Sequence, residues 1–286
     1  MSHSPAAPPQ ATVEAEARRA LDEDIGGGDL TAALLPADSS WSARIVCRES
    51  AVMAGRPWAD AVYAALDPRV TIDWRVRDGD ALVPETLICE LSGPARSLVT
   101  GERTALNFLQ TLAGTATRAR AFADAAAGTP TQILDTRKTL PGLRAAQKYA
   151  VRCGGCVNHR QGLHDAILIK ENHVMACGGI TPAVQTARGQ SPGVAIIVEV
   201  ENLGELNEAL ALDVDRIMVD NFSPPELADA VARGEGCTPL EVSGDVTLAN
   251  IADLAATGVD YISTGSLTKH VQAIDLSMRF RTDHSA

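Results

Sequence analysis

Long apolar runs are absent from this chain of 286 residues. A membrane-spanning helix needs roughly 20 consecutive apolar residues, and no stretch approaches that length, so we expect no contact with a membrane. The first ten residues are rich in Pro, Ala and Ser, and they lack the basic start and apolar segment of a secretion signal. We therefore expect residues 1–10 to form a disordered tail on a cytoplasmic protein.

A disulfide framework is also missing, although the chain contains six cysteines. They are scattered along a long sequence, whereas disulfide-rich domains are usually short and secreted, so we expect reduced thiols. Cys153 and Cys156 have the CxxC spacing of zinc and redox sites. A zinc site would need a second pair of ligands at matching spacing, and none is evident, so we interpret this pair as coincidence.

Basic residues are in the minority. Lys and Arg total 25 against 36 acidic residues, which gives a net charge of −11 and argues against a general nucleic-acid-binding protein. The segment from Thr136 to Lys170 is the exception, because it carries seven basic residues and one acid, Asp165. Such a stretch predicts a local pocket for a small polyanion. The alternative is a solvated helix face, which the spacing of four favours for Arg144, Lys148 and Arg152.

The composition fits a globular protein with one large domain or two unequal ones, since 45% of the residues are hydrophobic and 21% are charged. The first third mixes strand-like alternation with helical patterns, which predicts a sheet-plus-helix domain. The expected helices are 13–21, 57–66 and 100–127, the last one interrupted near Gly114, and the expected strands are 41–47, 71–76 and 86–91.

The remainder of the chain repeats one pattern, in which a short apolar run is followed by a polar end and a helical segment. The apolar runs lie at 132–134, 166–169, 194–198, 216–219, 240–242 and 261–262. This alternation predicts parallel βα units, in either a barrel or a doubly wound sheet. The carboxyl ends of barrel strands meet at one mouth, where active sites lie. Six polar ends in succession favour the barrel, although an open sheet uses the same end of its strands.

Cationic side chains follow the early runs. Arg137 can bind a carboxylate or phosphate through two parallel hydrogen bonds, and Lys138 adds a compact charge beside it. Arg160 is a second candidate of this kind, with His159 as a further donor. Taken singly, the Arg137–Lys138 pair is equally a surface feature and His159 a structural histidine. Lys170 ends an apolar run and is a candidate for fixed positive charge or for a Schiff base, two roles that the sequence does not separate.

Carboxylates and glycines end the later runs. Glu199 and Asp220 can hold Mg²⁺, accept hydrogen bonds from ribose hydroxyls or act as acid and base, and charge balance is their structural alternative. Ser243-Gly244-Asp245 and Thr264-Gly265-Ser266 end the last two runs. Glycine lets a backbone approach an oxyanion closely, and barrels often bind phosphate after their last two strands. Such a mouth suits a substrate with carboxylates and a phosphorylated sugar.

Several segments carry a resemblance to a known family. The stretch from Asp135 to His173, DTRKTLPGLRAAQKYAVRCGGCVNHRQGLHDAILIKENH, closely resembles the signature of quinolinate phosphoribosyltransferases. The other similar segments are DEDIGGGDLT (Asp22 to Thr31), GERTALNFLQTLAGTAT (Gly101 to Thr117), VEVEN (Val198 to Asn202) and ISTGSLTKHVQAIDLSMRF (Ile262 to Phe280). The resemblance covers nearly the whole chain after the tail.

The resemblance implies an N-terminal α/β sandwich domain at 11–115, rejoined by 275–286, and a C-terminal incomplete (β/α) barrel at 116–274. It implies transfer of a phosphoribosyl group from phosphoribosyl pyrophosphate to quinolinate with decarboxylation, which yields nicotinate mononucleotide, CO₂ and pyrophosphate for NAD synthesis. Mg²⁺ is the implied cofactor, and a homodimer or higher homo-oligomer is the implied assembly.

The resemblance also implies two sets of binding residues. The quinolinate set is Arg103, reaching in from the neighbouring subunit, with Thr136, Arg137, Lys138, His159, Arg160 and Lys170. The phosphoribosyl pyrophosphate set is Glu199, Asp220, Ser243, Gly244, Asp245, Thr264, Gly265, Ser266 and His270. Lys138, Lys170, Glu199 and Asp220 are the expected catalytic residues, and the two acids are the expected Mg²⁺ ligands, partly through the substrate.

Two positions depart from the family pattern. Cys156 stands where a third glycine is expected, and Asp245 stands where glycine or asparagine is more usual, so its negative charge must point away from a bound phosphate. Three alternatives stay open. They are a relative that takes nicotinate or another acid, a Schiff-base aldolase or lyase that uses Lys170, and a carrier module at 78–91, which lacks a lysine at the tip of its turn.

Overall fold

The computed structural model describes residues 5–234 and 236–282. The chain forms two compact units. The first comprises the chain up to Arg120, the segment Leu140–Gly155 and the chain from His270 onward, and the second comprises Ala121–Thr139 and Cys156–Lys269. None of the helices in the described ranges combines the length and apolar character that crossing a bilayer requires.

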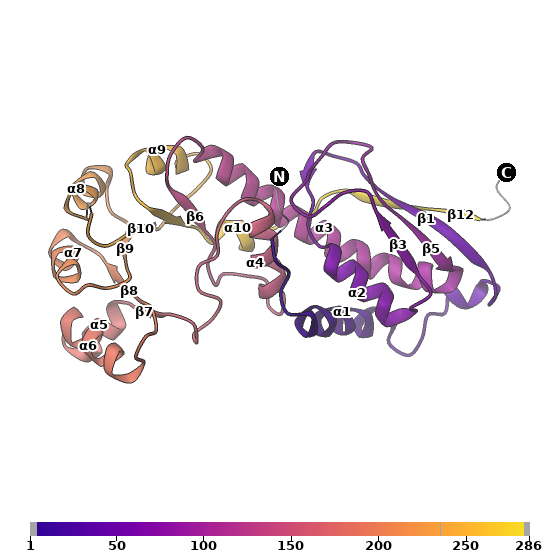
Figure 1. Cartoon of the computed structure of the whole chain (residues 1–286), viewed down its shortest axis with the longest axis horizontal. Helices are drawn as coiled ribbons and strands as arrows, with labels where there is room; N and C mark the ends of the chain where they lie inside the picture. Colours follow the sequence, from indigo (N-terminus) through magenta and orange to yellow (C-terminus); the bar gives the residue numbers. More distant parts are fainter. Residues whose placement is uncertain (1–4, 235, 283–286) are drawn as a thin grey trace. The chain divides into compact units, whose positions relative to one another are not determined.

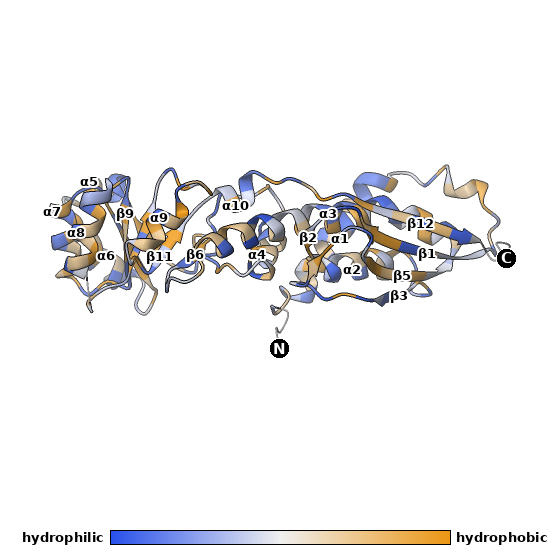
Figure 2. Cartoon of the chain, turned by 90° about the horizontal axis from the view of Figure 1, so that it is seen from above, coloured by the Kyte–Doolittle hydropathy of each residue, from blue (hydrophilic) through white to orange (hydrophobic). Residues whose placement is uncertain are grey.

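The first unit is built on a four-stranded antiparallel sheet in the order β12-β1-β5-β3. Its strands are β1 (Ser40–Cys47), β3 (Thr71–Trp74), β5 (Leu87–Pro94) and β12 (Leu276–Thr282). Successive side chains of a strand point to opposite faces, so Ala43, Ile45 and Cys47 of β1 are all buried on one face. Figure 2 colours the strands of this sheet by residue hydropathy, with both orange and blue stretches along them.

Helices cover that sheet and complete the α/β sandwich (Figure 1). They are α1 (Gln10–Ile25), α2 (Arg56–Leu66) and α3 (Ala95–Ala125). The apolar core between helices and sheet contains the fully buried Trp58, Tyr63 and Leu109. Two small features complete the unit, the 3₁₀ turn η1 (Ala32–Leu34) and the ribbon of β2 (Ala51–Val52) with β4 (Ala81–Leu82).

The expected interruption of the long helix near Gly114 is wrong, because α3 runs unbroken through that position. Gly114 serves close packing instead. A Cβ placed there would lie 2.0 Å from the carbonyl oxygen of Gln272 in the returning C-terminal segment. That segment continues into β12, which pairs with β1 along seven residues from Trp41 to Cys47.

The segment Leu140–Gly155 differs from expectation, because it belongs to the first unit rather than to the barrel. It contains α4 (Arg144–Cys153), whose Ala146, Tyr149 and Ala150 are buried in the core of the first unit. The hydroxyl of Tyr149 donates to Asp78 at 2.6 Å. These contacts explain why Leu140–Gly155 belongs to the first unit. The other limits of the units, Arg120 and His270, lie close to the expected limits 115 and 275.

The helix face of Arg144, Lys148 and Arg152 is not the solvated surface that their spacing suggested. Lys148 is only 1% exposed, because α4 is packed into the core. Arg152 donates from Nη2 to the carbonyl oxygen of Ala6 at 2.8 Å. In the expected tail, residues 1–4 lie outside the described ranges, and α1 already begins at Gln10.

The second unit is an incomplete (β/α) barrel of six parallel strands in the order β6-β11-β10-β9-β8-β7, so the predicted fold class is confirmed. The strands are β6 (Gln132–Leu134), β7 (Ile167–Ile169), β8 (Ile196–Val200), β9 (Arg216–Asp220), β10 (Leu240–Ser243) and β11 (Tyr261–Ser263). Each coincides with a predicted apolar run. β6 and β7 are the two edges, and Val157 adds a single bridge to the end of β6.

Helices follow the strands and lie on the outside of this sheet (Figure 1). They are α5 (Glu171–Cys177), α6 (Ile180–Gln190), α7 (Leu203–Leu210), α8 (Pro224–Gly234), α9 (Ile251–Ala256) and α10 (Ser266–Lys269). Their apolar faces bury residues such as Val184, Leu206 and Leu227. Since all six strands run in the same direction, their carboxyl ends meet on one side of the unit.

The role of Gly114 predicts opposite effects for two glycine-to-alanine changes. Gly114→Ala should lower the free energy of unfolding by about 2 kcal/mol, because the new Cβ collides with the backbone at Gln272. Gly189→Ala, in α6, meets no atom within 4 Å and should raise stability by up to about 1 kcal/mol through helix propensity. Urea unfolding of both variants measures this. Equal effects of the two changes would contradict the packing role.

Candidate functional site

The carboxyl ends of the barrel strands surround a cavity of about 230 Å³, which we call the mouth cavity. Every strand of the sheet or the residues directly after it contribute to its wall. The lining residues are Thr136, Arg137, Lys138, His159, Arg160, Leu168, Lys170, Glu199, Met218, Ser243 and Ser263. The structure thus brings together the whole predicted quinolinate set except Arg103, which lies in the first unit.

Other predicted residues lie beside the mouth cavity without lining it. Asp220 pairs in register with Ser243 across β9 and β10, and its charge acts on Glu199. The remaining residues of the second unit in this group follow β10 and β11, and they are Gly244, Asp245, Thr264, Gly265 and Ser266. His270 opens the last segment of the first unit.

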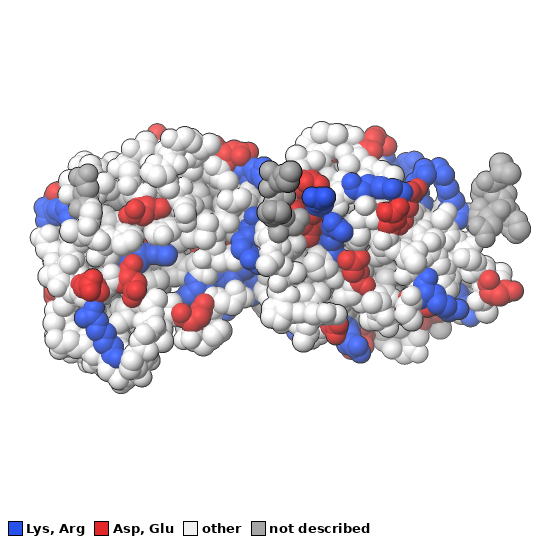
Figure 3. Space-filling view, in the orientation of Figure 1, with Lys and Arg blue, Asp and Glu red and all other residues white. Residues whose placement is uncertain are grey.

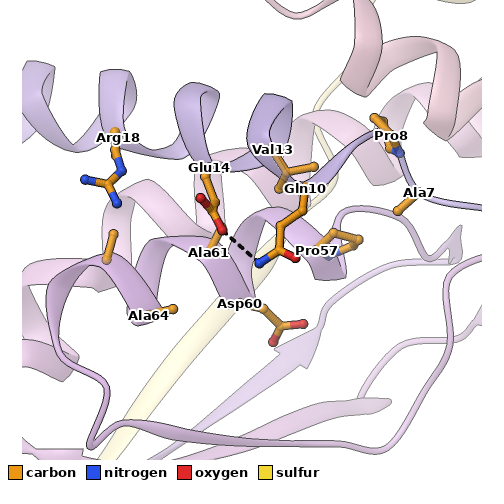
Figure 4. Close-up of a pocket in the computed structure, with 11 residues that line it drawn as sticks. Ala7, Pro8, Gln10, Val13, Glu14, Arg18, Pro57, Asp60, Ala61 and Ala64 are labelled. Atoms are coloured by element: carbon orange, nitrogen blue, oxygen red, sulfur yellow. Dashed lines mark hydrogen bonds between the residues drawn. The ribbon is translucent and has the colours of Figure 1, made fainter.

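Two larger hollows lie in the first unit, and neither has this chemistry. The one between α1 and α2, about 440 Å³, is walled mainly by small apolar residues (Figure 4). Gln10 donates to Glu14 across its rim, and Arg18 is its one basic lining residue. The second hollow, about 350 Å³, is lined by the acidic Glu16, Glu23 and Asp24. A polyanion fits the smaller, cation-lined mouth cavity better than either.

Lys138 is held by the loop that follows β11. Its N–H donates to Thr136 Oγ1 at 3.0 Å, and its carbonyl oxygen accepts from the hydroxyl of the buried Thr268 at 2.7 Å. A Cβ at Gly265 would lie 2.7 Å from Cδ of Lys138. Gly265 therefore provides the space through which the Lys138 side chain passes.

Arg160 lies close to Arg137. Its pKa is lowered, first by burial and then by the positive charge of Arg137, with Asp165 opposing the shift. Nη1 of Arg160 donates to the carbonyl oxygen of Ala166 at 3.0 Å, which fixes one side of the guanidinium. Two guanidinium groups that destabilise each other's charge form a site that a dianion would neutralise.

Two buried carboxylates that sequence reasoning missed hold the loop of His159 and Arg160. Asp135, with no exposed surface, accepts from the N–H of His159 at 2.9 Å and from Asn158 Nδ2 at 2.6 Å. Glu241, equally buried, lies 3.4 Å from His159 Nε2. A charged residue in the middle of an apolar strand was the available signal for Glu241.

The surroundings of Glu241 keep it ionised. Burial by itself would raise its pKa, but hydrogen bonds with His159, Ser263 and Arg216 outweigh burial, so the pKa is lowered. Arg216 Nη1 donates to Glu241 Oε2 at 2.8 Å, and its guanidinium lies 4.0 Å from the centre of the Tyr261 ring.

The ring of His159 is oriented from both sides. Nδ1 accepts from the N–H of Arg160 at 2.7 Å, so the ring proton of the neutral form is on Nε2, which faces Glu241. The sequence suggested His159 as a donor to a bound anion. These contacts instead connect the buried carboxylate Glu241 to the backbone of Arg160.

Lys170 and Glu199 both line the mouth cavity and form an ion pair. Glu199 is 8% exposed, and this burial raises the pKa of its carboxyl group. The hydrogen bond from Lys170 lowers the pKa in part, whereas the negative charge of Asp220 raises it further. An ion-paired lysine holds its proton and is a poor nucleophile. This favours fixed positive charge over a Schiff base as the role of Lys170.

The turns after β10 and β11 are polar and tightly bent. Gly244 has φ +96° and Asp245 φ +33°, and the exposed Asp245 is anchored through its carbonyl oxygen by Asn250 Nδ2 at 3.0 Å. The hydroxyl of Thr264 is within 3.1 Å of Ser266 Oγ, and both side chains are buried. These hydroxyls therefore stabilise the turn itself. The N–H of Ser266 donates to Thr264 Oγ1 at 3.2 Å, and the N–H of Thr264 donates to the carbonyl oxygen of Leu134 at 3.0 Å.

A magnesium ion would find few protein ligands here. In the described ranges, no group of three or more His, Cys, Asp or Glu side chains is arranged to hold a metal. Glu199 and Asp220 supply at most two carboxylates. Mg²⁺ commonly binds to one or two carboxylates plus substrate phosphates, so these residues fit an ion that arrives with a polyphosphate.

All six cysteines are free thiols. Cys153 and Cys156 are buried, and burial raises the pKa of Cys153 to about 12, so it is not a reactive thiolate at neutral pH. On the face drawn in Figure 3, charges of both signs are interspersed over each unit.

Comparison with known proteins gives matches over nearly the whole chain. The family model "Quinolinate phosphoribosyl transferase, N-terminal domain" matches residues 29–113, and the model of the C-terminal domain of the same family matches residues 115–279. A probable carboxylating nicotinate-nucleotide pyrophosphorylase from Synechocystis is 43% identical over 276 residues, which cover 95% of this chain and 94% of the relative. The carboxylating nicotinate-nucleotide pyrophosphorylase of Mycobacterium leprae is 42% identical over 91% of this chain and 94% of its own length.

A solved structure is similar along its full length as well. The nicotinate-nucleotide pyrophosphorylase from Francisella tularensis superimposes with a TM-score of 0.93 at 45% identity. The match covers 96% of this chain and 98% of that one. The two-unit architecture described above is therefore the fold of these relatives.

The buried position of Glu241 predicts a pH-dependent loss of stability in Glu241→Gln. At neutral pH the variant should be less stable by about 3 kcal/mol, because Arg216 loses its charged partner. The folded pKa of Glu241 lies below its unfolded value of about 4.3, so its contribution is fully present above that pH and is lost as the pH falls through the lower, folded pKa.

Urea unfolding at pH 7 and in steps below about pH 4 measures this difference. The stability gap between the parent chain and Glu241→Gln should narrow in acid. The matched change Glu23→Gln, at an exposed position, should leave the stability almost unchanged. A gap that stays constant with pH would show that Glu241 is not ionised in the folded protein.

Proposed function

This chain belongs to the quinolinate phosphoribosyltransferase family, and we propose from this premise and the chemistry of the mouth cavity how it performs the family's reaction. The protein is a pentosyltransferase of NAD biosynthesis. It transfers the phosphoribosyl group of phosphoribosyl pyrophosphate to quinolinate with loss of CO₂, forming nicotinate mononucleotide and pyrophosphate. The observation that carries the proposal is the gathering of Arg137, Lys138, Arg160 and Lys170 around one small cavity in a protein of net charge −11.

Quinolinate presents two adjacent carboxylates, and the cation side of the cavity offers matching charge. Arg137 and Arg160 each can form two parallel hydrogen bonds to a carboxylate, and Lys138 and Lys170 add compact charges. Thr136 and His159 complete this wall. Without such cations, bringing like charges within about 4 Å would cost on the order of 4 kcal/mol at an intermediate dielectric.

The sugar and phosphates are assigned to the opposite side. Glu199 and Asp220 accept hydrogen bonds from the ribose hydroxyls. The 5′-phosphate is assigned to the turns after β10 and β11, with His270 as a further ligand, and the turn residues are Ser243, Gly244, Asp245, Thr264, Gly265 and Ser266. Glu199 and Asp220 would hold Mg²⁺ together with the substrate phosphates, and the ion would supply positive charge to neutralise the pyrophosphate leaving group.

The chemistry needs positioning more than covalent help from the protein. The bond from C1′ to the pyrophosphate oxygen breaks, C1′ gains oxocarbenium character beside Glu199 and Asp220, and the pyridine nitrogen forms the new bond to C1′. The positively charged ring then stabilises the carbanion that remains when the adjacent carboxylate leaves as CO₂. A proton completes the product at that carbon.

Two rivals are tested by the same geometry. A Lys170 Schiff-base aldolase is disfavoured, because the Lys170 ammonium is engaged in an ion pair with Glu199. A relative that takes nicotinate needs cations for only one carboxylate, whereas four surround this cavity. Two further assignments, a cytoplasmic location and a homodimer or higher homo-oligomer, agree with the free thiols and the family.

The assay that tests the function compares two acids. With phosphoribosyl pyrophosphate and Mg²⁺, the purified chain should convert quinolinate into nicotinate mononucleotide, with one CO₂ and one pyrophosphate released per product. Nicotinate should give neither product nor pyrophosphate. Turnover of nicotinate at a comparable rate, or product from quinolinate without CO₂, would overturn the assignment.

The cation wall is tested in the same assay with Arg137→Ala and Arg160→Ala. Each should raise the KM for quinolinate at least about tenfold, because a charge-assisted bidentate contact is lost. The control Arg233→Ala removes an arginine that pairs with Asp229 on α8, and it should leave the KM unchanged. Unaltered quinolinate KM values in both cavity variants would refute the role of this wall.

The proposal that Arg103 completes the neighbouring subunit's site predicts complementation between inactive variants. Arg103→Ala and Lys138→Ala should each be nearly inactive alone. After mixing and subunit exchange, hybrid dimers contain one intact site, so activity should return to about a quarter of the parent value. No recovery despite proven exchange would place Arg103 in the site of its own chain or outside any site.

A further inference from the structure

Asn221 lies at the carboxyl ends of β9 and β10 and contacts both, and we assign both ends to phosphoribosyl pyrophosphate. β9 and β10 are parallel and in register, with Asp220 opposite Ser243. The next residues along the two strands, Asn221 and Gly244, therefore lie side by side just beyond the last paired position. The N–H of Asn221 continues the ladder by donating to the carbonyl oxygen of Ser243 at 3.2 Å.

The amide of Asn221 occupies the space that a side chain at position 244 would need. A Cβ at Gly244 would lie 2.1 Å from Oδ1 of Asn221, well inside van der Waals contact. The φ of Gly244, +96°, is a second reason for glycine at this position. The Asn221 amide is thus a sufficient reason for glycine at position 244, and no phosphate contact is needed to explain it. The absence of a side chain at Gly244 in turn leaves the room in which the Asn221 amide lies.

From this position, Nδ2 of Asn221 donates to Oδ2 of Asp220 at 2.9 Å. The backbone of Asn221 is left-handed, with φ +55°, a conformation that Asn, Asp and Gly adopt more readily than other residues. Of these three, only Asn supplies an N–H donor at the end of its side chain. The position therefore specifies asparagine through both its backbone and its contact with Asp220.

We propose that Asn221 is a positioning residue for phosphoribosyl pyrophosphate. Its amide engages one carboxylate oxygen of Asp220 and leaves the other, Oδ1, to accept a bond from a ribose hydroxyl. Asn221 acts through Asp220 and has no part in binding quinolinate. This inference rests on the proposed function, which assigns Asp220 to the ribose.

Two variants separate the amide contact from the backbone conformation. Asn221→Gly removes the amide and tolerates the left-handed backbone, and it should raise the KM for phosphoribosyl pyrophosphate about fivefold. Asn221→Asp keeps the size and the backbone tolerance but turns a like charge toward Asp220, and it should raise this KM more than about tenfold. The KM for quinolinate should stay within about twofold of the parent value in both variants.

The matched control is Asn202→Gly. Asn202 stands after the neighbouring strand β8, where it accepts from the N–H of Glu205 at 3.0 Å and caps α7. Replacing a capping asparagine by glycine costs only a few tenths of a kcal/mol. Both KM values should be those of the parent, which shows that losing an asparagine at a strand end is not sufficient for the effect.

A double-mutant cycle with Asp220→Ala decides the outcome. If Asn221 acts through Asp220, adding Asn221→Gly to Asp220→Ala should change the KM for phosphoribosyl pyrophosphate by less than about twofold. Full additivity, an equal rise in both KM values with a lower Tm, or no change in either Asn221 variant would each overturn the positioning role. If Asp220→Ala itself leaves this KM unchanged, the assignment of Asp220 fails and the inference fails with it.

Discussion

The mouth cavity depends on holding the charged guanidinium groups of Arg137 and Arg160 close to each other. The pKa of Arg160 is lowered first by its burial and then by the positive charge of Arg137. The protein keeps them together by fixing the backbone behind Arg160, through the chain of contacts from Glu241 to His159 to the Arg160 N–H. Asp135 anchors the same loop. The charge of Asp165 opposes the lowering of the Arg160 pKa, and a dianionic substrate, as proposed above, would offset the remaining repulsion from the open side.

The quinolinate half and the phosphoribosyl pyrophosphate half of the proposed site are built from different structural features. Quinolinate is assigned to long cationic side chains, of which Lys138 has Gly265 and Thr268 as close neighbours. Phosphoribosyl pyrophosphate is assigned to short turns with left-handed backbones at Asn221 and Gly244. The pair of Lys170 and Glu199 connects the halves, because each partner is assigned to a different substrate. Filling one half therefore changes the charge that the other half presents.

The alternation of apolar runs with polar ends predicted all six barrel strands and most of the residues that line the mouth cavity. The sandwich and the incomplete barrel, as opposed to an open sheet, came from the family resemblance. Prediction from the sequence failed where long-range packing decides. Gly114 looked like a helix break, but its partner Gln272 is far away in the chain. The spacing of Lys148 suggested a solvated side chain, but Lys148 is buried. The helix α4 that carries it belongs to the first unit, whereas the expected location was the barrel. Asn221 and Asp135 acquire their roles from neighbours on other segments, which no local pattern shows. Roles of single residues toward each substrate stay predictions.

The segment Leu140–Gly155 belongs to the first unit but lies in the sequence between two segments of the second, so the chain cannot be cut into the two units at a single position. The family models meet between residues 113 and 115, which suggests two separable pieces. A fragment that began there would carry α4 without the core that surrounds Tyr149 and Ala150, and would expose these apolar side chains to water. Both cation-bearing segments, Arg137–Lys138 before Leu140–Gly155 and His159–Arg160 after it, are tethered to its ends. A fragment cut at the boundary between the family models would therefore lack most of the core against which α4 packs.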